Sequence, residues 1–280
     1  MAKRIGEKNI MSQTELIETE LIQTMLTDTE KSKIKLSFVI PAYNEEDRLG
    51  KNLEHLQDYL HRKGINGEII VVDDGSNDNT SEIVFRHRAK YVGYRRNRGI
   101  SYAFRYGARF ARGEIVLFIP ADLDSPEILE DLLFPLENGS DVVQTSKRHP
   151  KSIVIGYSKS RWAFSNLWNR FIRFMFAVPY TDTDFVRAFR RSVLETILPK
   201  CRLDRAAGEP EMIVRAHRAG FKIKLIPCKI IHTDKGRVNI KFIINSVLAL
   251  IKLRFWLFEE DLEKLVGFKD SCTSTFSKRL

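Results

Sequence analysis

The first half of the chain alternates short apolar runs with amphipathic segments. The apolar runs, rich in Val, Ile, Leu and Phe, read as buried strands at residues 36–40, 68–72, 89–93, 114–119 and 141–144. Between them, apolar positions recur every three or four residues, as on helices that cover a sheet, at residues 49–63, 81–87 and 100–111 and after Ser125-Pro126-Glu127. This alternation predicts an α/β fold with a doubly wound, mostly parallel sheet and helices on both faces.

The pattern changes after Pro150. Residues 157–178 are dense in aromatic and basic side chains, and residues 239–258 form a long apolar stretch interrupted by basic residues. Both segments have the composition of helices that lie at a membrane interface. We therefore expect a polar, helical appendage at residues 1–33, an α/β domain at 34–235, an amphipathic helix at 236–268 and a disordered tail at 269–280.

Charge and cysteine content limit the classes of partner and of compartment that fit this chain. The chain has 280 residues, a net charge of +10 and a pI near 9.5, which favours anionic ligands or an anionic membrane surface. The basic residues form no known nucleic-acid motif, so a nucleic-acid partner is not expected. The chain has three cysteines, which are scattered along the sequence. They fit neither a disulfide framework nor a zinc site, which indicates a reducing compartment. We see no secretory signal and no segment apolar enough to cross a bilayer.

Polar residues follow the predicted strands at their carboxyl ends, which is where open α/β sheets bind ligands. Asp73 and Asp74 end one apolar run, and the stretch from Pro41 to Glu46 follows another. A carboxylate at such a strand end can accept hydrogen bonds from a nucleobase or a ribose, so these loops predict a nucleotide site.

Asp122 and Asp124 follow the apolar run at 114–119. Two carboxylates with one residue between them can hold Mg²⁺ or Mn²⁺ on a diphosphate, or can simply belong to a polar loop that leads into a helix. The neighbouring nucleotide loops favour the metal site. Of the basic residues after Arg95, we expect Arg105, Arg109 and Arg112 to lie on a solvated helix face.

Together these motifs resemble the inverting glycosyltransferases of family 2, which have the GT-A fold. The matching segments are residues 39–45 (VIPAYNE), 71–76 (VVDDGS), 97–99 (NRG) and 121–124 (ADLD). Later segments are similar to the dolichyl- or polyprenyl-phosphate mannose and glucose synthases of that family. These are residues 146–148 (SKR) and 186–190 (VRAFR), together with Arg161 and Ser165.

The resemblance implies roles for individual residues. Asp74 would contact the base or the ribose and Asp73 would support the turn, while Asp122 and Asp124 would hold the metal and act in catalysis. Arg148 and Arg161 would act on the acceptor phosphate. The remaining substrate contacts would come from Pro41, Tyr43, Glu45, Asn97, Gly99, Ala121, Lys147, Ser165 and Arg237.

The implied reaction is transfer of a hexose from a GDP- or UDP-sugar to a polyprenyl or dolichyl phosphate, with inversion, at the cytoplasmic membrane face. An ionised phosphate needs no strong general base. Two alternatives stay open. One is a soluble transferase that acts on a glycan or protein hydroxyl, with Glu209 or Glu211 as the base. The other is a non-catalytic nucleotide-binding relative, which Pro120 in the metal loop would favour. Self-association also stays open.

Overall fold

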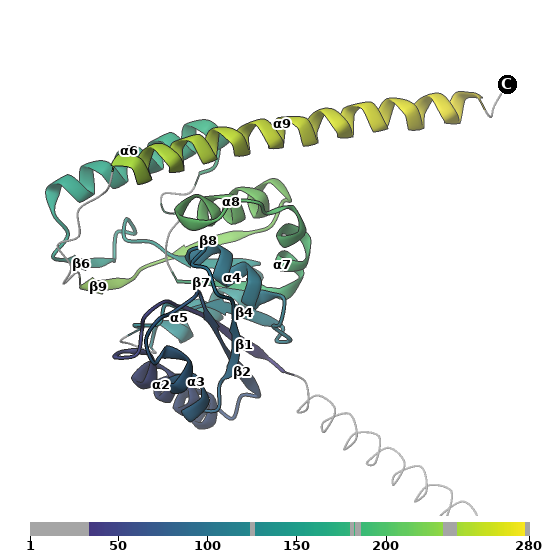
Figure 1. The fold of residues 1–280 in the computed structure, drawn as a ribbon. Helices are drawn as coiled ribbons and strands as arrows, with labels where there is room; N and C mark the ends of the chain where they lie inside the picture. Colours follow the sequence, from purple (N-terminus) through teal and green to yellow (C-terminus); the bar gives the residue numbers. More distant parts are fainter. Residues whose placement is uncertain (1–33, 124–126, 180–181, 183–185, 232–239, 278–280) are drawn as a thin grey trace, which may run out of the picture.

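The computed structural model describes residues 34–123, 127–179, 182, 186–231 and 240–277 (Figure 1). Its first half alternates strands and helices, as the hydrophobic pattern predicts. The strands are β1 (Leu36–Ala42), β2 (Gly67–Asp73), β3 (Lys90–Gly93) and β4 (Ile115–Phe118). The helices are α2 (Leu49–Lys63), α3 (Thr80–Arg86), α4 (Ile100–Ala108) and α5 (Ile128–Glu137).

A seven-stranded sheet with the order β3-β2-β1-β4-β7-β5-β8 forms the centre of the molecule. Its other strands are β5 (Val142–Thr145), β7 (Arg187–Arg190) and β8 (Ile223–Ile226). All neighbours are parallel except β7, which runs antiparallel between β4 and β5. Strand β1 lies between β2 and β4, where the chain order reverses. Such a switch point is where α/β sheets bind ligands.

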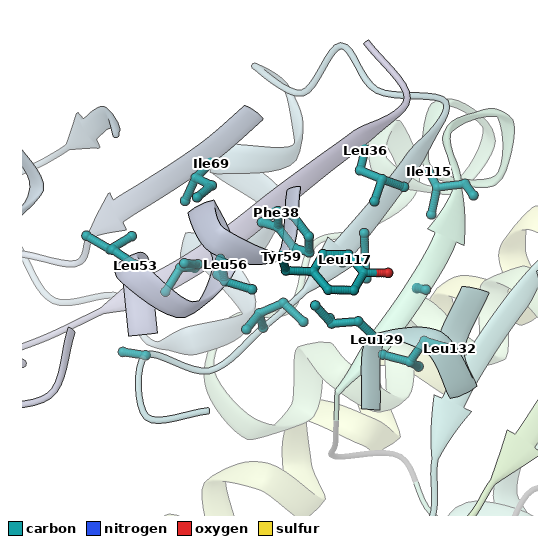
Figure 2. Packing of buried hydrophobic residues seen from close by; sticks show 14 of the residues in the cluster. Leu36, Phe38, Leu53, Leu56, Tyr59, Ile69, Ile115, Leu117, Leu129 and Leu132 are labelled. Carbon is teal, nitrogen blue, oxygen red and sulfur yellow. The ribbon is translucent and has the colours of Figure 1, made fainter. Parts of the chain in front are cut away.

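Helices cover both faces of the sheet. Because successive strand residues point to opposite faces, Phe38 and Ile40 of β1 pack on one side and Val39 on the other. Figure 2 shows the first cluster, in which Leu53 and Leu56 of α2 and Leu129 and Leu132 of α5 meet the sheet. The second cluster joins the sheet to α4, α7 (Arg191–Ile197) and α8 (Arg205–Arg218). The predicted doubly wound, mostly parallel α/β sheet is confirmed.

A small sheet and two long helices of the second half lie outside this sandwich. Strands β6 (Ile153–Ile155) and β9 (Lys229–Ile231) form a small parallel sheet. Helices α6 (Lys159–Phe176) and α9 (Ile240–Ser277) lie across one side of the domain, above α8 in Figure 1. A third cluster that includes Ile172 of α6, Val214 of α8 and Leu253 of α9 attaches these helices to the body.

Several elements differ from the predicted ones. Helix α9 continues to Ser277, so residues 269–277 are helical and the disorder predicted for them is not found. No proline interrupts the segment, and a helix can therefore propagate through it. Helix α4 ends at Ala108, before the predicted 111. The appendage at 1–33 lies outside the described residues. No helix of the described chain is both long and apolar enough to span a membrane.

Candidate functional site

The loops after β1 and β2 are tied together by Asn44. Its amide oxygen accepts a hydrogen bond from the Asn77 backbone N–H at 2.9 Å, and its own N–H donates to the Ser76 hydroxyl at 3.0 Å. Asn44 has a φ of 55°, in the left-handed region that asparagine tolerates better than most residues. This geometry fixes the predicted contact residues beside it, because exposed Tyr43 and half-buried Glu45 flank Asn44, and buried Pro41 is the penultimate residue of β1.

Asp73 and Asp74 have different partners although they are adjacent. One oxygen of Asp73 accepts the Ser76 N–H at 2.8 Å, and the other accepts the Tyr91 hydroxyl at 2.9 Å. Asp73 therefore holds the turn, in the way that the sequence predicts. Both oxygens of Asp74 accept backbone N–H groups at 2.7 Å, from Arg98 and Gly99. Asp74 is only 3% exposed, so its first task is to hold the loop that carries Asn97 and Gly99.

The same loop is held from its other side by the start of α8. Arg98 donates to Asp204 at 2.8 Å, and Arg205 reaches the carbonyl oxygen of Asn97 at 3.3 Å. A Cβ at Gly99 would lie 2.8 Å from the side chain of Arg205, and Gly99 has a φ of 93°. Glycine is therefore required at this close approach for two reasons.

Arg105 does not lie on the solvated face that the sequence predicts for it. Its side chain is 10% exposed, and its guanidinium is ion-paired with Asp204 at 2.5 Å and with Glu211 at 4.0 Å. Sequence alone missed this because both acids are about a hundred positions away along the chain. Arg109 and Arg112 are exposed as expected.

The loop after β4 presents Asp122 at the same edge of the sheet. Its carboxylate is 52% exposed and lies 3.2 Å from Nη1 of Arg48. The backbone before it is fixed, because Asn52 donates to the carbonyl oxygen of Pro120 at 2.9 Å. Burial raises the pKa of Glu45, against the opposing effect of Arg48, and Asp122 raises it further. Asp124 lies outside the described residues.

The donor chemistry of this loop suits a hard divalent cation. Among the described residues, no group of three or more His, Cys, Asp or Glu side chains gathers at one point. Mg²⁺ at a diphosphate does not need such a group, because it takes one or two carboxylates and completes its shell with phosphate oxygens and water. The exposed carboxylate of Asp122 is of that type, so the residues present fit the metal.

A pocket of about 570 Å³ opens beside this loop. Asp122, Glu127 and Asp131 line it on the side of β4 and α5, and Glu209 of α8 and Thr145 of β5 also contribute. Lys151, Ile153 and residues 227–230 line it on the side of the small sheet. Its volume is in the range of small-molecule sites.

Asp182 organises the residues that the resemblance assigns to the acceptor phosphate. This carboxylate is fully buried, accepts a hydrogen bond from Ser146 at 2.9 Å, and is paired with Arg148 and, at 3.7 Å, with Lys147. Arg148 also donates to Ser165 at 2.8 Å. Lys147, Arg148 and Ser165 are thus brought together by Asp182, a residue to which the sequence pattern assigned no role.

Three further predicted residues are Arg161, Ala121 and Arg237. Arg161 is half-buried in the first turn of α6, where its N–H donates to the Ser158 hydroxyl at 3.3 Å. Ala121 is buried beside Asp122. Arg237 lies outside the described residues.

Of the two candidate bases, only Glu209 faces the pocket. It accepts a hydrogen bond from the fully buried Arg187 at 3.2 Å. Glu211 is fully buried and accepts backbone N–H groups from Arg202 and Leu203, the latter at 2.7 Å. Its bonding is that of a structural residue.

Comparison with known proteins agrees with this geometry. The family model described as glycosyl transferase family 2 matches residues 37–198, more than half of the chain. A dolichyl-phosphate beta-glucosyltransferase of Trichomonas vaginalis is 28% identical over 249 residues, which cover 80% of this chain and 74% of that protein. An undecaprenyl-phosphate 4-deoxy-4-formamido-L-arabinose transferase of Shewanella sediminis is 32% identical over 171 residues, or 58% of this chain and 50% of that one.

Solved structures share the fold. Glucosyl-3-phosphoglycerate synthase from Mycobacterium tuberculosis, in complex with Mn²⁺, UDP and glucosyl-3-phosphoglycerate, superposes with a TM-score of 0.61 at 21% identity. The match covers 80% of this chain and 81% of that one, which confirms the predicted GT-A architecture. The chain belongs to glycosyltransferase family 2 and is a glycosyltransferase.

Proposed function

We propose that this enzyme transfers a hexose from a UDP- or GDP-sugar to a polyprenyl or dolichyl phosphate, with inversion, at the cytoplasmic face of a membrane. The observation that carries the proposal is the pocket beside Asp122, where the loop after β4 meets a second set of residues from β5, α8 and the small sheet. The dolichyl-phosphate and undecaprenyl-phosphate sugar transferases among the relatives support this class of acceptor.

On the donor side, the nucleoside lies against Pro41, Tyr43 and Glu45 and the loop of Asn97 and Gly99. Asp74 keeps that loop in place through its two backbone hydrogen bonds and contacts the base or ribose with its remaining acceptor capacity. Ala121 leaves room next to the diphosphate. The conformation of the two loops is set before the donor arrives, which lowers the entropy lost on binding.

Asp122, together with Asp124, would hold Mg²⁺ or Mn²⁺ at the diphosphate. When bound, the metal neutralises the charge that develops on the departing nucleoside diphosphate. Arg48 pairs with Asp122 and would have to release that carboxylate to a metal.

On the acceptor side, an oxygen of the lipid phosphate attacks the anomeric carbon. The new carbon–oxygen bond forms as the bond to the nucleoside diphosphate breaks, and the leaving group departs with the electron pair. The ionised phosphate brings no proton that must be removed, so no strong base is required. Arg148, Lys147, Ser165 and Arg161 shape the acceptor end, with Asp182 fixing the first two.

A lipid acceptor must be met at a membrane surface. Helix α6 exposes Leu167 (67%) and Phe174 (87%) next to Arg170 and Arg173. Helix α9 exposes an apolar stripe on the side away from its buried leucines: Ile244, Leu248, Ile251, Phe255, Phe258 and Leu262. Exposed apolar stripes with basic neighbours support binding of both helices to an anionic bilayer.

Transfer to a hydroxyl acceptor is the second candidate, and the position of Glu209 in the pocket favours it. A panel assay separates the two. UDP-glucose and GDP-mannose are each offered with Mn²⁺ and either a polyprenyl phosphate or an oligosaccharide. We expect a polyprenyl-phosphate hexose of inverted anomeric configuration, whereas transfer to oligosaccharides alone would favour Glu209 as a base.

A further inference from the structure

The pocket beside Asp122 has sides of opposite charge. Asp122, Glu127 and Asp131 supply the acidic side. The basic side comes from Lys151 and Lys229, which belong to the small sheet and the loop before it. Neither ammonium group is paired with a carboxylate of the described residues, and both lysines are exposed.

A rigid unit holds the backbone of both lysines. Ser152 donates to the carbonyl oxygen of Ser146 at 2.6 Å, and the Cys228 N–H donates to the Ser152 hydroxyl at 3.0 Å. The Ile153 N–H then bonds to the carbonyl oxygen of Cys228 at 2.9 Å, which aligns Ile153 with Lys229 in the parallel pair. Lys151 and Lys229 are therefore carried at a fixed spacing, although they are far apart in the sequence.

The cations that the family resemblance assigns to the acceptor are placed differently. The Arg148 guanidinium is bound by Asp182, Ser165 and Asn166, and Lys147 is 4% exposed next to Asp182. Neither of them lines the pocket. A phosphate that entered the pocket would therefore meet Lys151 and Lys229 before it met Arg148 or Lys147.

The geometry of the reaction suggests what these two lysines bind. In an inverting displacement the nucleophile approaches the anomeric carbon from the side opposite the leaving group. The diphosphate belongs with Asp122 on the acidic side, so the attacking phosphate belongs on the basic side. We propose that Lys151 and Lys229 bind the phosphate of the acceptor, an inference that rests on the proposed function and deepens it.

The same sheet offers a path for the prenyl chain. Ile153 and Ile155 of β6 are 53% and 51% exposed, and Ile230 of β9 lines the pocket with Ile153. An acceptor whose phosphate lies between the lysines can lay its first isoprene units on these side chains. The site therefore selects a prenyl monophosphate over a free sugar phosphate.

Binding of farnesyl monophosphate to the full chain, measured by calorimetry, tests this directly, with farnesol as the uncharged probe. We expect the Lys151→Gln/Lys229→Gln variant to bind the monophosphate at least about tenfold more weakly, the factor lost with one charge-assisted hydrogen bond. Lys224→Gln removes an exposed lysine of β8 outside the pocket and should bind as the wild type does. Unchanged melting temperatures would show that the variants fold.

Transfer kinetics provide the second readout. The double variant should raise KM for polyprenyl phosphate by a similar factor and leave KM for the nucleotide sugar unchanged. Unaltered monophosphate affinity in the double variant, or loss of affinity only in Arg148→Gln, would overturn the inference, as would a wild type that does not bind the probe. Binding that depends on the lysines without any hexose transfer would refute the proposed function and leave Lys151 and Lys229 as a phosphate site without an acceptor role.

Discussion

At the scale of single residues, the acids at the strand ends are distinguished by their partners. Asp73 and Asp74 accept hydrogen bonds from nearby loops and are buried, whereas Asp122 is half exposed. Sequence predicted where these acids lie, because the ends of parallel strands share one edge of the sheet. It could not predict which acid is already bonded, because the donors come from loops up to 25 positions away.

Asp122→Asn tests the assigned metal ligand. An amide is a weaker ligand than a carboxylate, so we expect turnover to fall at least about a hundredfold and Mn²⁺ to stop strengthening UDP binding. Steady-state assays and calorimetry check both effects. Asp131→Asn, which changes another exposed carboxylate of the same pocket, is the control and should retain most activity. Near-normal turnover of Asp122→Asn would contradict the metal role.

Tyr91 predicts a pH dependence of stability. Burial, together with the hydrogen bond to Asp73, raises its pKa from 10.0 to about 12. The folded state thus keeps a proton that the unfolded state loses, so this stabilisation is complete below pH 10 and is lost as the pH rises towards 12. We expect Tyr91→Phe to cost about 1 kcal/mol at pH 8.

Urea unfolding of wild type and Tyr91→Phe at several pH values measures this. The difference in unfolding free energy should shrink between pH 10 and 12, because phenylalanine has no proton to lose. A difference that stays constant over that range would show that the Tyr91 hydroxyl titrates normally.

At the scale of elements, the first half followed its local pattern, whereas the second half did so in helices α6 and α9 but not in strand β7. Strands β1, β2 and β4 are apolar runs, so periodicity alone found them. Strand β7 consists of Arg187, Ala188, Phe189 and Arg190. Two apolar residues between two arginines are too short a pattern to predict a strand. Its place is set by long-range contacts, in which the buried Arg187 donates to Gln144 of β5 and Glu209 of α8. No local pattern encodes such a network.

Removing one member of the Arg187 network should therefore lower the free energy of unfolding strongly. We expect Arg187→Met to lower the free energy of unfolding by roughly 3–5 kcal/mol, because it leaves the Glu209 carboxylate without its buried cation. Arg191→Met breaks an exposed pair with Glu195 and should cost less than about 1 kcal/mol. Chemical denaturation of both variants gives the comparison.

A double variant checks that the cost comes from the pair. Arg187→Met with Glu209→Gln should be more stable than the sum of the single changes predicts, with a coupling energy of about 1–3 kcal/mol. Strictly additive effects would mean that Arg187 stabilises the sheet by packing alone.

At the scale of the whole molecule, the long helices add an exposed apolar surface to the α/β domain, and we propose that this surface contacts lipid. Helices α6 and α9 lie together on one side of the domain (Figure 1) and expose apolar side chains there. The net charge of +10 adds attraction to anionic lipids. The composition of these two segments predicted that they would form interfacial helices. Which of their side chains are exposed could not be predicted, because that depends on how α9 packs against α8.

Vesicle sedimentation tests this surface. Leu167→Ser/Phe174→Ser should bind anionic vesicles at least about tenfold more weakly than wild type, because two large apolar groups are lost. Phe134→Ser, which removes an exposed ring (67%) from α5, should bind as wild type does. Equal binding of all three proteins would exclude α6 from the contact.

The central claim is that a prenyl phosphate receives the hexose. The most direct measurement is transfer of labelled glucose from UDP-glucose, or mannose from GDP-mannose, into lipid extracts that contain polyprenyl phosphate and Mn²⁺. The account predicts a labelled polyprenyl-phosphate hexose with the wild-type enzyme and almost none with Asp122→Asn. Label that appears only in water-soluble glycans, or equally in the lipid fraction of both proteins, would contradict it.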